Sequence, residues 1–284
     1  KYYALHAGES EGVAEAVEEH YMPRAAEGDL PATTPGAVLA VADKIDTVAG
    51  YFAVGLAPTG SADPYQLRRH ALGIIRILDR FNFPVPVTAL IGIAMDRFGP
   101  DVIPPEKRAD LARELMDFFR IRFSGYMESE GYDYDVVNAV DLARAPGVNE
   151  ARQRADALSE VRGAVEFKEL HEVFTRVSNI QKKSADSGDF TKDTADPGAF
   201  TEDAEKRLFE SYSDISRRWA GEAPGYAEKL RGLYSLTAPA HNFFDSVMVM
   251  AEDREVRANR LALLKQLREL YLEVADFREI VISG

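Results

Sequence analysis

The stretch REVRANRLALLKQLRELYLEVADF, residues 254–277, decides the fold class of this chain. Its larger apolar residues recur at steps built from three and four positions, which places them on one face of a helix. They are Val256, Leu263, Leu267, Leu270, Val274 and Phe277. An apolar stripe of this kind needs partner helices to cover it. We therefore expect an antiparallel helical bundle in the C-terminal part of the chain.

The same helical periodicity continues outward from this stretch through most of the sequence, and few segments alternate as strands do. The chain is thus predicted to be all-α, with several helical domains. Asp63 before Pro64 is a typical helix start, with an acidic cap followed by proline. The expected helices are Glu11–His20, Thr34–Phe52, Pro64–Arg80, Val85–Phe98, Pro105–Glu130, Asp133–Arg144 and Asn149–Ser178, the last broken near Gly163, followed by one that begins at Thr201 and Glu202.

Loop composition divides the 284 residues into three predicted domains, 1–62, 63–147 and 148–284. A loop rich in glycine and proline, residues 55–63, ends the first domain. Pro146-Gly147 stops a helix and marks the second boundary. The segment Ser184–Phe200 is rich in Ser, Asp, Gly and Thr, so we expect it to be disordered.

The composition limits the classes of function. A formal net charge of −13 argues against indiscriminate polyanion binding, so any contact with nucleic acid requires a local basic patch. The absence of cysteine excludes disulfides, thiolate nucleophiles and cysteine-bound zinc. No window is apolar enough for a membrane span or a signal-peptide core, so we expect no membrane partner and a cytoplasmic location. The chain starts without Met inside a helical segment, and we interpret it as part of a longer protein.

One group of His and acidic residues has the chemistry of a hard metal site or a phosphohydrolase centre: His6, Glu9, His20, Asp43 and Asp46. These residues are scattered over several helices, and no two histidines have the spacing of metal ligands. Asp43 and Asp46 can equally serve as caps or ion-pair partners. We expect no metal ion, with His6, His20 and Asp43 as the only candidates. No nucleotide-binding or nucleophile motif is present either, so no catalytic residue is predicted.

Arginines gather on the predicted helix that follows Pro64. Arg68, Arg69, Arg76 and Arg80 lie on it, and the last three are spaced to share one face. Guanidinium groups in this arrangement suit phosphate binding. The alternative is a solvated face whose arginines pair with Asp79 or other acids.

The C-terminal bundle holds further candidates for nucleic-acid binding. Four polar residues close its first long helix, and four basic residues open its last one. They are Arg176, Asn179, Lys182 and Lys183, and Arg254, Arg257, Arg260 and Lys265. Phe243 and Phe244 lie between them in the sequence. Stacking rings with amide and basic groups are typical of single-stranded RNA recognition. Alternatively, the rings belong to the core and the basic residues cap helices or pair with nearby acids.

Several motifs together resemble the β subunit of bacterial glycyl-tRNA synthetase. The first is Ala42-Asp43-Lys44-Ile45-Asp46-Thr47, continuing through Pro58-Thr59-Gly60-Ser61 to Leu67-Arg68-Arg69. Others occur at 131–140, 176–180 and 243–277, including Asn259-Arg260-Leu261-Ala262-Leu263-Leu264-Lys265. The motifs follow the family's order, so the resemblance covers nearly the whole chain.

The resemblance implies an HD-like helical remnant in residues 1–62 and a DALR-like anticodon-binding bundle in residues 148–284. Where the family commonly has His-Asp-Gly-Glu, this chain has His6-Ala7-Gly8-Glu9, so one carboxylate of a metal centre is lost. The implied partners are tRNA(Gly) and the synthetase α subunit, which uses ATP to activate glycine, so this chain is expected to bind no cofactor. Two alternatives stay open, a phosphohydrolase remnant and a structural module that only assembles the subunits.

Overall fold

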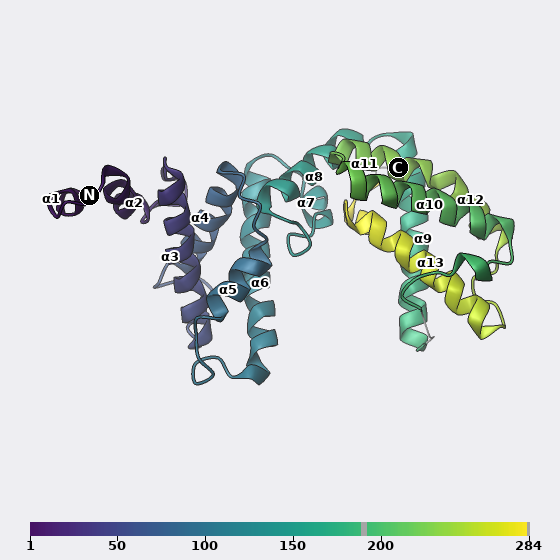
Figure 1. The fold of residues 1–284 in the computed structure, drawn as a ribbon, viewed down its shortest axis with the longest axis horizontal. Coiled ribbons are helices and arrows are strands. Elements are labelled where there is room, and N and C mark those ends of the chain that lie inside the picture. Colours follow the sequence, from purple (N-terminus) through teal and green to yellow (C-terminus); the bar gives the residue numbers. More distant parts are fainter. Residues whose placement is uncertain (189–191, 283–284) are drawn as a thin grey trace. The chain divides into compact units, whose positions relative to one another are not determined.

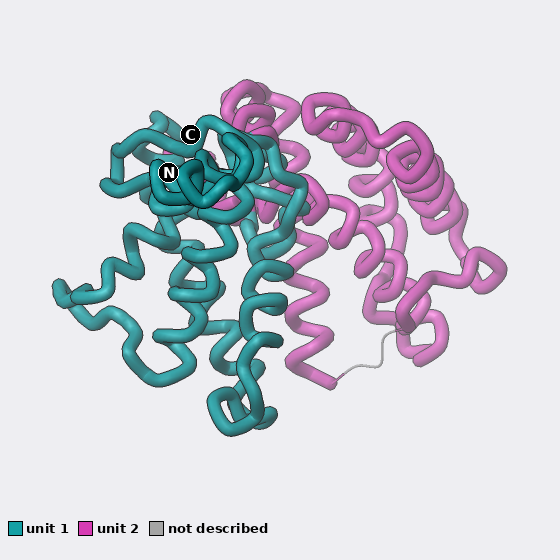
Figure 2. Tube along the Cα trace, turned by 60° about the vertical axis from the view of Figure 1, so that its left-hand side comes forward, with its two compact units in different colours: residues 1–132, 141–152 teal, residues 133–140, 153–284 magenta. Residues whose placement is uncertain are grey.

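The computed structural model describes residues 1–188 and 192–282, and it confirms the all-α prediction. Within these ranges no strand forms, and the only β pairing is an isolated bridge between Thr59 and Ala62. Figure 1 shows the helices in sequence order. The chain divides into two compact units (Figure 2), residues 1–132 with 141–152, and residues 133–140 with 153–284. The finer three-domain division stays a prediction.

Unit 1 is built from six α-helices among its described residues, with a short 3-10 turn, Pro105–Lys107, before the last of them. They are α1 (Tyr2–His6), α2 (Glu11–Glu19), α3 (Thr34–Ala53), α4 (Leu67–Arg80), α5 (Val87–Met95) and α6 (Arg108–Ser129). Helix α3 packs against α2, α4 and α5, and α4 packs against α6. Apolar faces such as that of Ile74, Ile75 and Leu78 on α4 are almost completely buried and form the core of this unit.

A buried carboxylate joins α2 to the start of α3. Glu19 accepts hydrogen bonds from the Thr33 hydroxyl at 2.6 Å and from the backbone N–H groups of Thr33 and Ala32 at 3.1 Å each. Thr33 in turn caps α3 by accepting from the N–H of Gly36. Gly36 has no side chain because a Cβ there would lie 2.0 Å from a Glu19 carboxylate oxygen.

Helix α4 starts three residues later than predicted. Asp63 does act as the cap, because its carboxylate accepts from the backbone N–H groups of Leu67 and Arg68 at 2.8 and 3.0 Å. However, Gln66 has a positive φ of 58°, which an α-helix cannot continue through. The residues between Asp63 and Leu67 therefore form a turn, and Pro64 is not the first helical residue.

Unit 2 contains α7 (Tyr134–Ala139), α9 (Val165–Ser187), α10 (Asp203–Glu222), α11 (Tyr226–Ser235), α12 (Thr237–Ser246) and α13 (Arg254–Leu272), with 3-10 turns at Pro197–Ala199 and Phe277–Glu279. Helix α8 (Val148–Val161) crosses the boundary between the units. The predicted break near Gly163 is confirmed, since α8 ends at Val161 and α9 begins at Val165. The helix predicted for Asp133–Arg144 is wrong at its C-terminal end, because Val140 is already extended.

Helices α9 and α13 form the central antiparallel pair of this unit. The rings of Phe174 and Tyr271 stack at 5.5 Å, and the Gln181 side chain donates to the backbone carbonyl of Leu261 at 2.8 Å. Tyr271 and Phe277 are fully buried. The apolar stripe that predicted a bundle is thus covered by partner helices, although α13 ends at Leu272 and Phe277 belongs to a following turn.

The segment expected to be disordered, Ser184–Phe200, is mostly ordered. Its first residues continue α9 to Ser187, residues 189–191 lie outside the described residues, and residues 192–200 are bonded to α13. There the side chains of Asn259 and Gln266 hydrogen-bond the backbone of Asp196 and Ala195 at 2.7 to 3.0 Å. Tertiary hydrogen bonds fix a stretch whose composition alone indicates a loop. No described helix has the length and apolarity that crossing a membrane requires.

Candidate nucleic-acid-binding site

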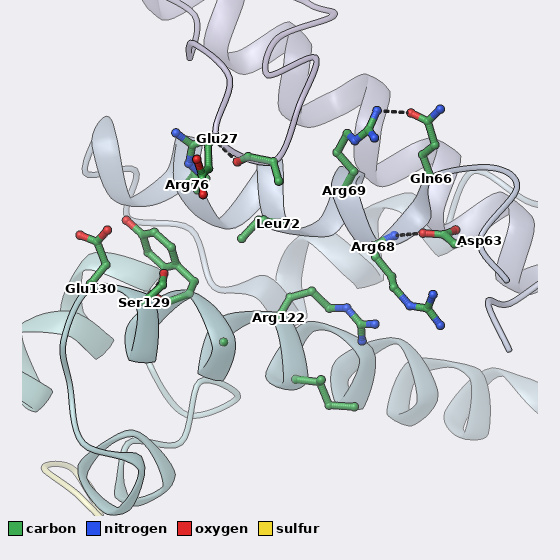
Figure 3. A pocket seen from close by; sticks show the side chains of 14 residues that line it. Glu27, Asp63, Gln66, Arg68, Arg69, Leu72, Arg76, Arg122, Ser129 and Glu130 are labelled. Atoms are coloured by element: carbon green, nitrogen blue, oxygen red, sulfur yellow. Dashed lines mark hydrogen bonds between the residues drawn. The ribbon is translucent and has the colours of Figure 1, made fainter. Parts of the chain in front are cut away.

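An open pocket of about 800 Å³ lies between α4 and α6 in unit 1 (Figure 3). Each helix lines it with one face: Arg68, Arg69, Leu72 and Arg76 come from α4, and Ile121, Arg122, Gly125, Tyr126 and Ser129 come from α6. We call this pocket the arginine cradle, after Arg68, Arg69, Arg76 and Arg122. Figure 3 shows the side chains of Arg68 and Arg122, one from each helix, in the space between the two helices.

Backbone carbonyl groups hold the four arginines of the cradle in place. Arg68 donates to Gly60 O at 2.6 Å, Arg69 to Arg24 O at 3.2 Å, Arg76 to Ala26 O at 2.6 Å, and Arg122 to Phe118 O at 3.0 Å. Within the described residues, none of the four forms an ion pair with a carboxylate. Neutral acceptors therefore orient these guanidinium groups without cancelling their charge.

Burial and neighbouring charges both act on Arg122, in a pocket that Glu27, Asp63 and Glu130 also line. Burial lowers the pKa of its guanidinium, and the neighbouring Arg68 lowers it further, while Asp63 acts in the opposite direction. The Arg122 guanidinium also lies 3.9 Å from the centre of the Phe118 ring, which fixes its position on α6. An anionic ligand between Arg68 and Arg122 would relieve their repulsion.

The alternative in which these arginines pair with Asp79 is not what the structure shows. Asp79 accepts a bidentate pair of hydrogen bonds from Arg152, with its shortest contact at 2.7 Å, and a further bond from the Tyr126 hydroxyl at 2.7 Å. Both oxygens are thus occupied away from the cradle arginines. Of the four arginines predicted to gather on this helix, Arg68, Arg69 and Arg76 line the cradle, and Arg80 is exposed outside it. Arg122 was missed, and no sequence pattern connects it to α4.

In unit 2 the structure separates the predicted RNA-binding residues into accessible and inaccessible groups. Arg176, Asn179, Lys182 and Lys183 on α9 and Arg254 on α13 are exposed. Lys182 and Lys265 line one groove of about 400 Å³ between α9 and α13, together with Arg268 and Arg278. This groove therefore brings together one basic residue from each of the two predicted groups, Lys182 on α9 and Lys265 on α13. Carboxylates compensate part of this groove, since Lys265 pairs with Asp193 at 2.8 Å.

Three of the predicted RNA-binding side chains are turned into the interior of unit 2. Phe243 and Phe244 are 0% and 7% exposed, so neither ring can stack on a base, and Arg176 lies 4.3 Å from the centre of the Phe244 ring. Arg260 is 6% exposed and pairs with Glu205 at 2.7 Å. These assignments are corrected: the apolar face of α12 requires burial of the rings, and a buried carboxylate takes up the charge of Arg260. Arg257 is half-buried and donates to Ala251 O at 2.9 Å.

The candidate metal ligands lie apart from one another. His6 is exposed on α1, His20 follows α2 and bonds its own helix through Val17 O at 2.7 Å, and Asp43 is exposed on α3. No group of three His, Cys, Asp or Glu side chains suited to a metal ion occurs in residues 1–188 and 192–282. The phosphohydrolase alternative gains no support from this geometry.

Comparison with known proteins finds two family models that match this chain. Residues 170–276, which lie within unit 2, match the family model described as the DALR anticodon binding domain. Residues 1–141 match the family described as the glycyl-tRNA synthetase beta subunit. The chain belongs to the glycyl-tRNA synthetase beta-subunit family.

Three curated relatives, each named glycine–tRNA ligase beta subunit, illustrate the match. The chain is 40% identical over 280 residues to the protein of Oceanobacillus iheyensis, 38% over 283 residues to that of Desulforamulus reducens, and 40% over 277 residues to that of Pseudomonas aeruginosa. These alignments cover 97 to 99% of this chain and 40% of each relative. The chain thus spans about two fifths of the length of the relatives it matches.

Proposed function

We propose that this chain is the tRNA-binding part of the β subunit of a heterotetrameric glycine–tRNA ligase. It binds tRNA(Gly) in the cytoplasm and positions it for glycylation by the α subunit, which uses ATP. The observation that carries the proposal is the arginine cradle. Four arginines and three carboxylates, Glu27, Asp63 and Glu130, line it, and none of the four arginines forms an ion pair with a carboxylate among the described residues, in a chain whose formal net charge is −13.

An acidic protein repels RNA over most of its surface, so the places where cations stay unpaired determine where RNA can bind. Some arginines of unit 1 are offset by carboxylates, as Arg120 is by Asp117 and Asp141. The cradle arginines instead bond neutral carbonyls and keep their charge. Arginine forks match phosphate oxygens in geometry as well as in charge. The cradle therefore suits the phosphate backbone of a tRNA.

In unit 2 the exposed end of α9 is the part best placed to contact the anticodon region. Lys182 and Lys183 supply phosphate contacts, and the exposed amide of Asn179 can both donate to and accept from a base edge. Phe243 and Phe244 take no part because they are core residues. RNA recognition in unit 2 therefore depends on hydrogen bonds to base edges and on charge, and no base stacks on these two rings.

The contribution of this chain to catalysis is orientation. Binding a tRNA at separated points fixes the position of its acceptor end. The entropy cost of orienting this end at the α subunit is then met by binding, before the reaction. We assign no catalytic residue and no cofactor to this chain.

The test is equilibrium binding of tRNA(Gly) to purified chain by fluorescence anisotropy. Arg76→Gln and Arg122→Gln are each expected to weaken binding by about tenfold, since a charge-assisted contact to phosphate contributes on the order of 1.5 kcal/mol. The matched control is Arg217→Gln, an exposed arginine on α10 that pairs only with the neighbouring Asp214 among the described residues. Wild-type affinity in both cradle variants, with intact circular dichroism, would remove the cradle from the RNA-binding surface.

A further inference from the structure

A second pocket of about 500 Å³ lies in unit 1 beside the arginine cradle, and Arg69 and Gln66 line both. Its other polar walls are Arg24, which follows α2, Asp43 and Lys44 on α3, and His70 on α4. We call it the Lys44–His70 pocket. It is formed by different residues from those that carry the proposed tRNA contacts of the cradle, apart from the two shared side chains.

Lys44 is a cation in the interior of unit 1. It is 3% exposed, and its ammonium donates one hydrogen bond, to His20 O at 2.9 Å. No carboxylate lies within ion-pair distance of it among the described residues. Burial lowers the pKa of Lys44, with Asp43 acting in the opposite direction. A buried charge without a counterion is costly, and such a group in a pocket is a candidate for ligand binding.

The neighbouring helix is shaped to admit this lysine. Gly73 on α4 faces the Lys44 stem, and a Cβ at this position would lie 3.4 Å from Lys44 Cε and 3.1 Å from two ring carbons of Pro23. The ammonium has three protons, of which one is bonded to His20 O. The remaining donors are available to a ligand in the pocket.

His70 adds a polar atom that has no partner. Its ring is half-buried, and Nδ1 is buried without a hydrogen-bond partner in the described part of the chain. Burial lowers the pKa of His70, and Lys44 and Arg69 lower it further, while Asp43 and Asp63 raise it. The neutral ring can place an N–H at Nδ1 and donate it to an oxygen atom.

We propose that the Lys44–His70 pocket binds a phosphoryl group, with Lys44, Arg69 and Arg24 supplying positive charge and His70 Nδ1 supplying a neutral donor. An oxyanion with several oxygens is the ligand class that accepts from all of these donors at once. The phosphoryl group can come from an RNA phosphate or from free phosphate. Only the first source rests on the proposed tRNA function.

In the competing structural interpretation, Lys44 serves only to donate a hydrogen bond to the carbonyl of His20 at the end of α2. That interpretation predicts a loss of stability when Lys44 is replaced, and no response of His70 to phosphate. The two interpretations therefore differ in a spectroscopic signal at His70.

The experiment follows the histidine ring signals of the purified chain by NMR. The chain has five histidines, so each ring can be resolved, and His70→Gln assigns the signal of interest. Inorganic phosphate is added at constant ionic strength and near-neutral pH, with chloride as the reference. The His70 signal is expected to shift saturably with phosphate and to stay in place with chloride.

Lys44→Met keeps the apolar stem and removes the charge, and it is expected to weaken the phosphate response by about tenfold or more. Should that variant fold poorly, Arg24→Gln changes an exposed wall residue of the same pocket and is expected to weaken the response as well. Arg217→Gln is the matched control, because Arg217 lies on α10 and lines neither pocket. A His70 signal that ignores phosphate, or that shifts equally in wild type and Lys44→Met, would overturn the proposal.

Short RNAs with and without a terminal phosphate distinguish the two sources. A His70 shift with RNA, lost in Lys44→Met, supports an RNA phosphate in the pocket. A shift with inorganic phosphate only supports a small-molecule site. Failure of the tRNA proposal is recognised separately, by cradle variants that keep wild-type tRNA affinity.

Discussion

At the scale of single residues, charged side chains have two different roles in unit 1. Some connect helices through hydrogen bonds, and others form the candidate binding sites. Glu19 connects α2 to the start of α3. Burial tends to raise its pKa, but hydrogen bonds from the Thr33 hydroxyl and from two backbone N–H groups outweigh this effect and hold the pKa below the ordinary value of 4.5. The cradle arginines are the opposite case. Their partners are neutral carbonyls, so the fold orients their charge and leaves it available.

We predict that Glu19→Gln destabilises the chain at neutral pH by about 1 to 2 kcal/mol, because charge-assisted hydrogen bonds at the start of α3 are lost. A carboxyl with a lowered folded-state pKa contributes stability above its unfolded pKa and loses it as the pH falls through the folded value. The difference between wild type and variant should therefore shrink below about pH 4.5. Urea unfolding at neutral and acidic pH measures this. Glu18→Gln, an exposed neighbour, should show little change, and a pH-independent gap for Glu19→Gln would contradict the assignment.

The sequence identifies residues whose role is local and misses those whose role depends on a neighbouring element. Asp63 is recognisable as a cap because its partners, Leu67 and Arg68, follow within one turn. Arg122 is not recognisable, since its partner across the cradle lies on a helix some fifty positions earlier in the chain. The core alternative for Phe243 is recognisable in the sequence, whereas the pairing of Arg260 with Glu205 is not, since the two residues lie on different helices.

At the scale of elements, the helices themselves follow from periodicity, and their ends are where predictions fail. The ends of α4 and α7 depend on the backbone of Gln66 and Val140, which no apolar pattern encodes. In unit 2 a buried ion pair connects two helices. Glu205 forms the capping box of α10 and also pairs with Arg260 of α13, while Arg260 donates to Met248 O at 2.8 Å.

We predict that Arg260→Met destabilises the chain by about 3 to 5 kcal/mol, because Glu205 would stay buried without its counterion. The double variant Arg260→Met/Glu205→Gln should recover part of this loss, since it removes both charges. Urea unfolding of the single and double variants measures the coupling. A single variant with wild-type stability and weakened tRNA binding would contradict this structural role and restore Arg260 as an RNA contact.

At the scale of the whole molecule, an acidic chain presents a few cationic places of different kinds. The cradle offers guanidinium groups, which bind phosphates of any sequence, whereas the end of α9 adds the exposed amide of Asn179. Phosphate contacts position a nucleic acid, and contacts to base edges specify it. Affinity and specificity should therefore respond to different substitutions.

Substitutions at Arg76 and Asn179 should separate affinity from specificity. Arg76→Gln should weaken binding of tRNA(Gly) and of a non-cognate tRNA by similar factors, and it should reduce the slope of log affinity against log salt by about one. Asn179→Ala should leave that slope unchanged and reduce the preference for tRNA(Gly), because its amide carries no charge to exchange for counterions. Anisotropy titrations of both tRNAs across a salt series give slope and preference together, with Arg217→Gln as the common control. A cognate preference that survives Asn179→Ala would place base recognition elsewhere in the assembled enzyme, and a lost preference in Arg76→Gln would show that the cradle reads more than phosphate.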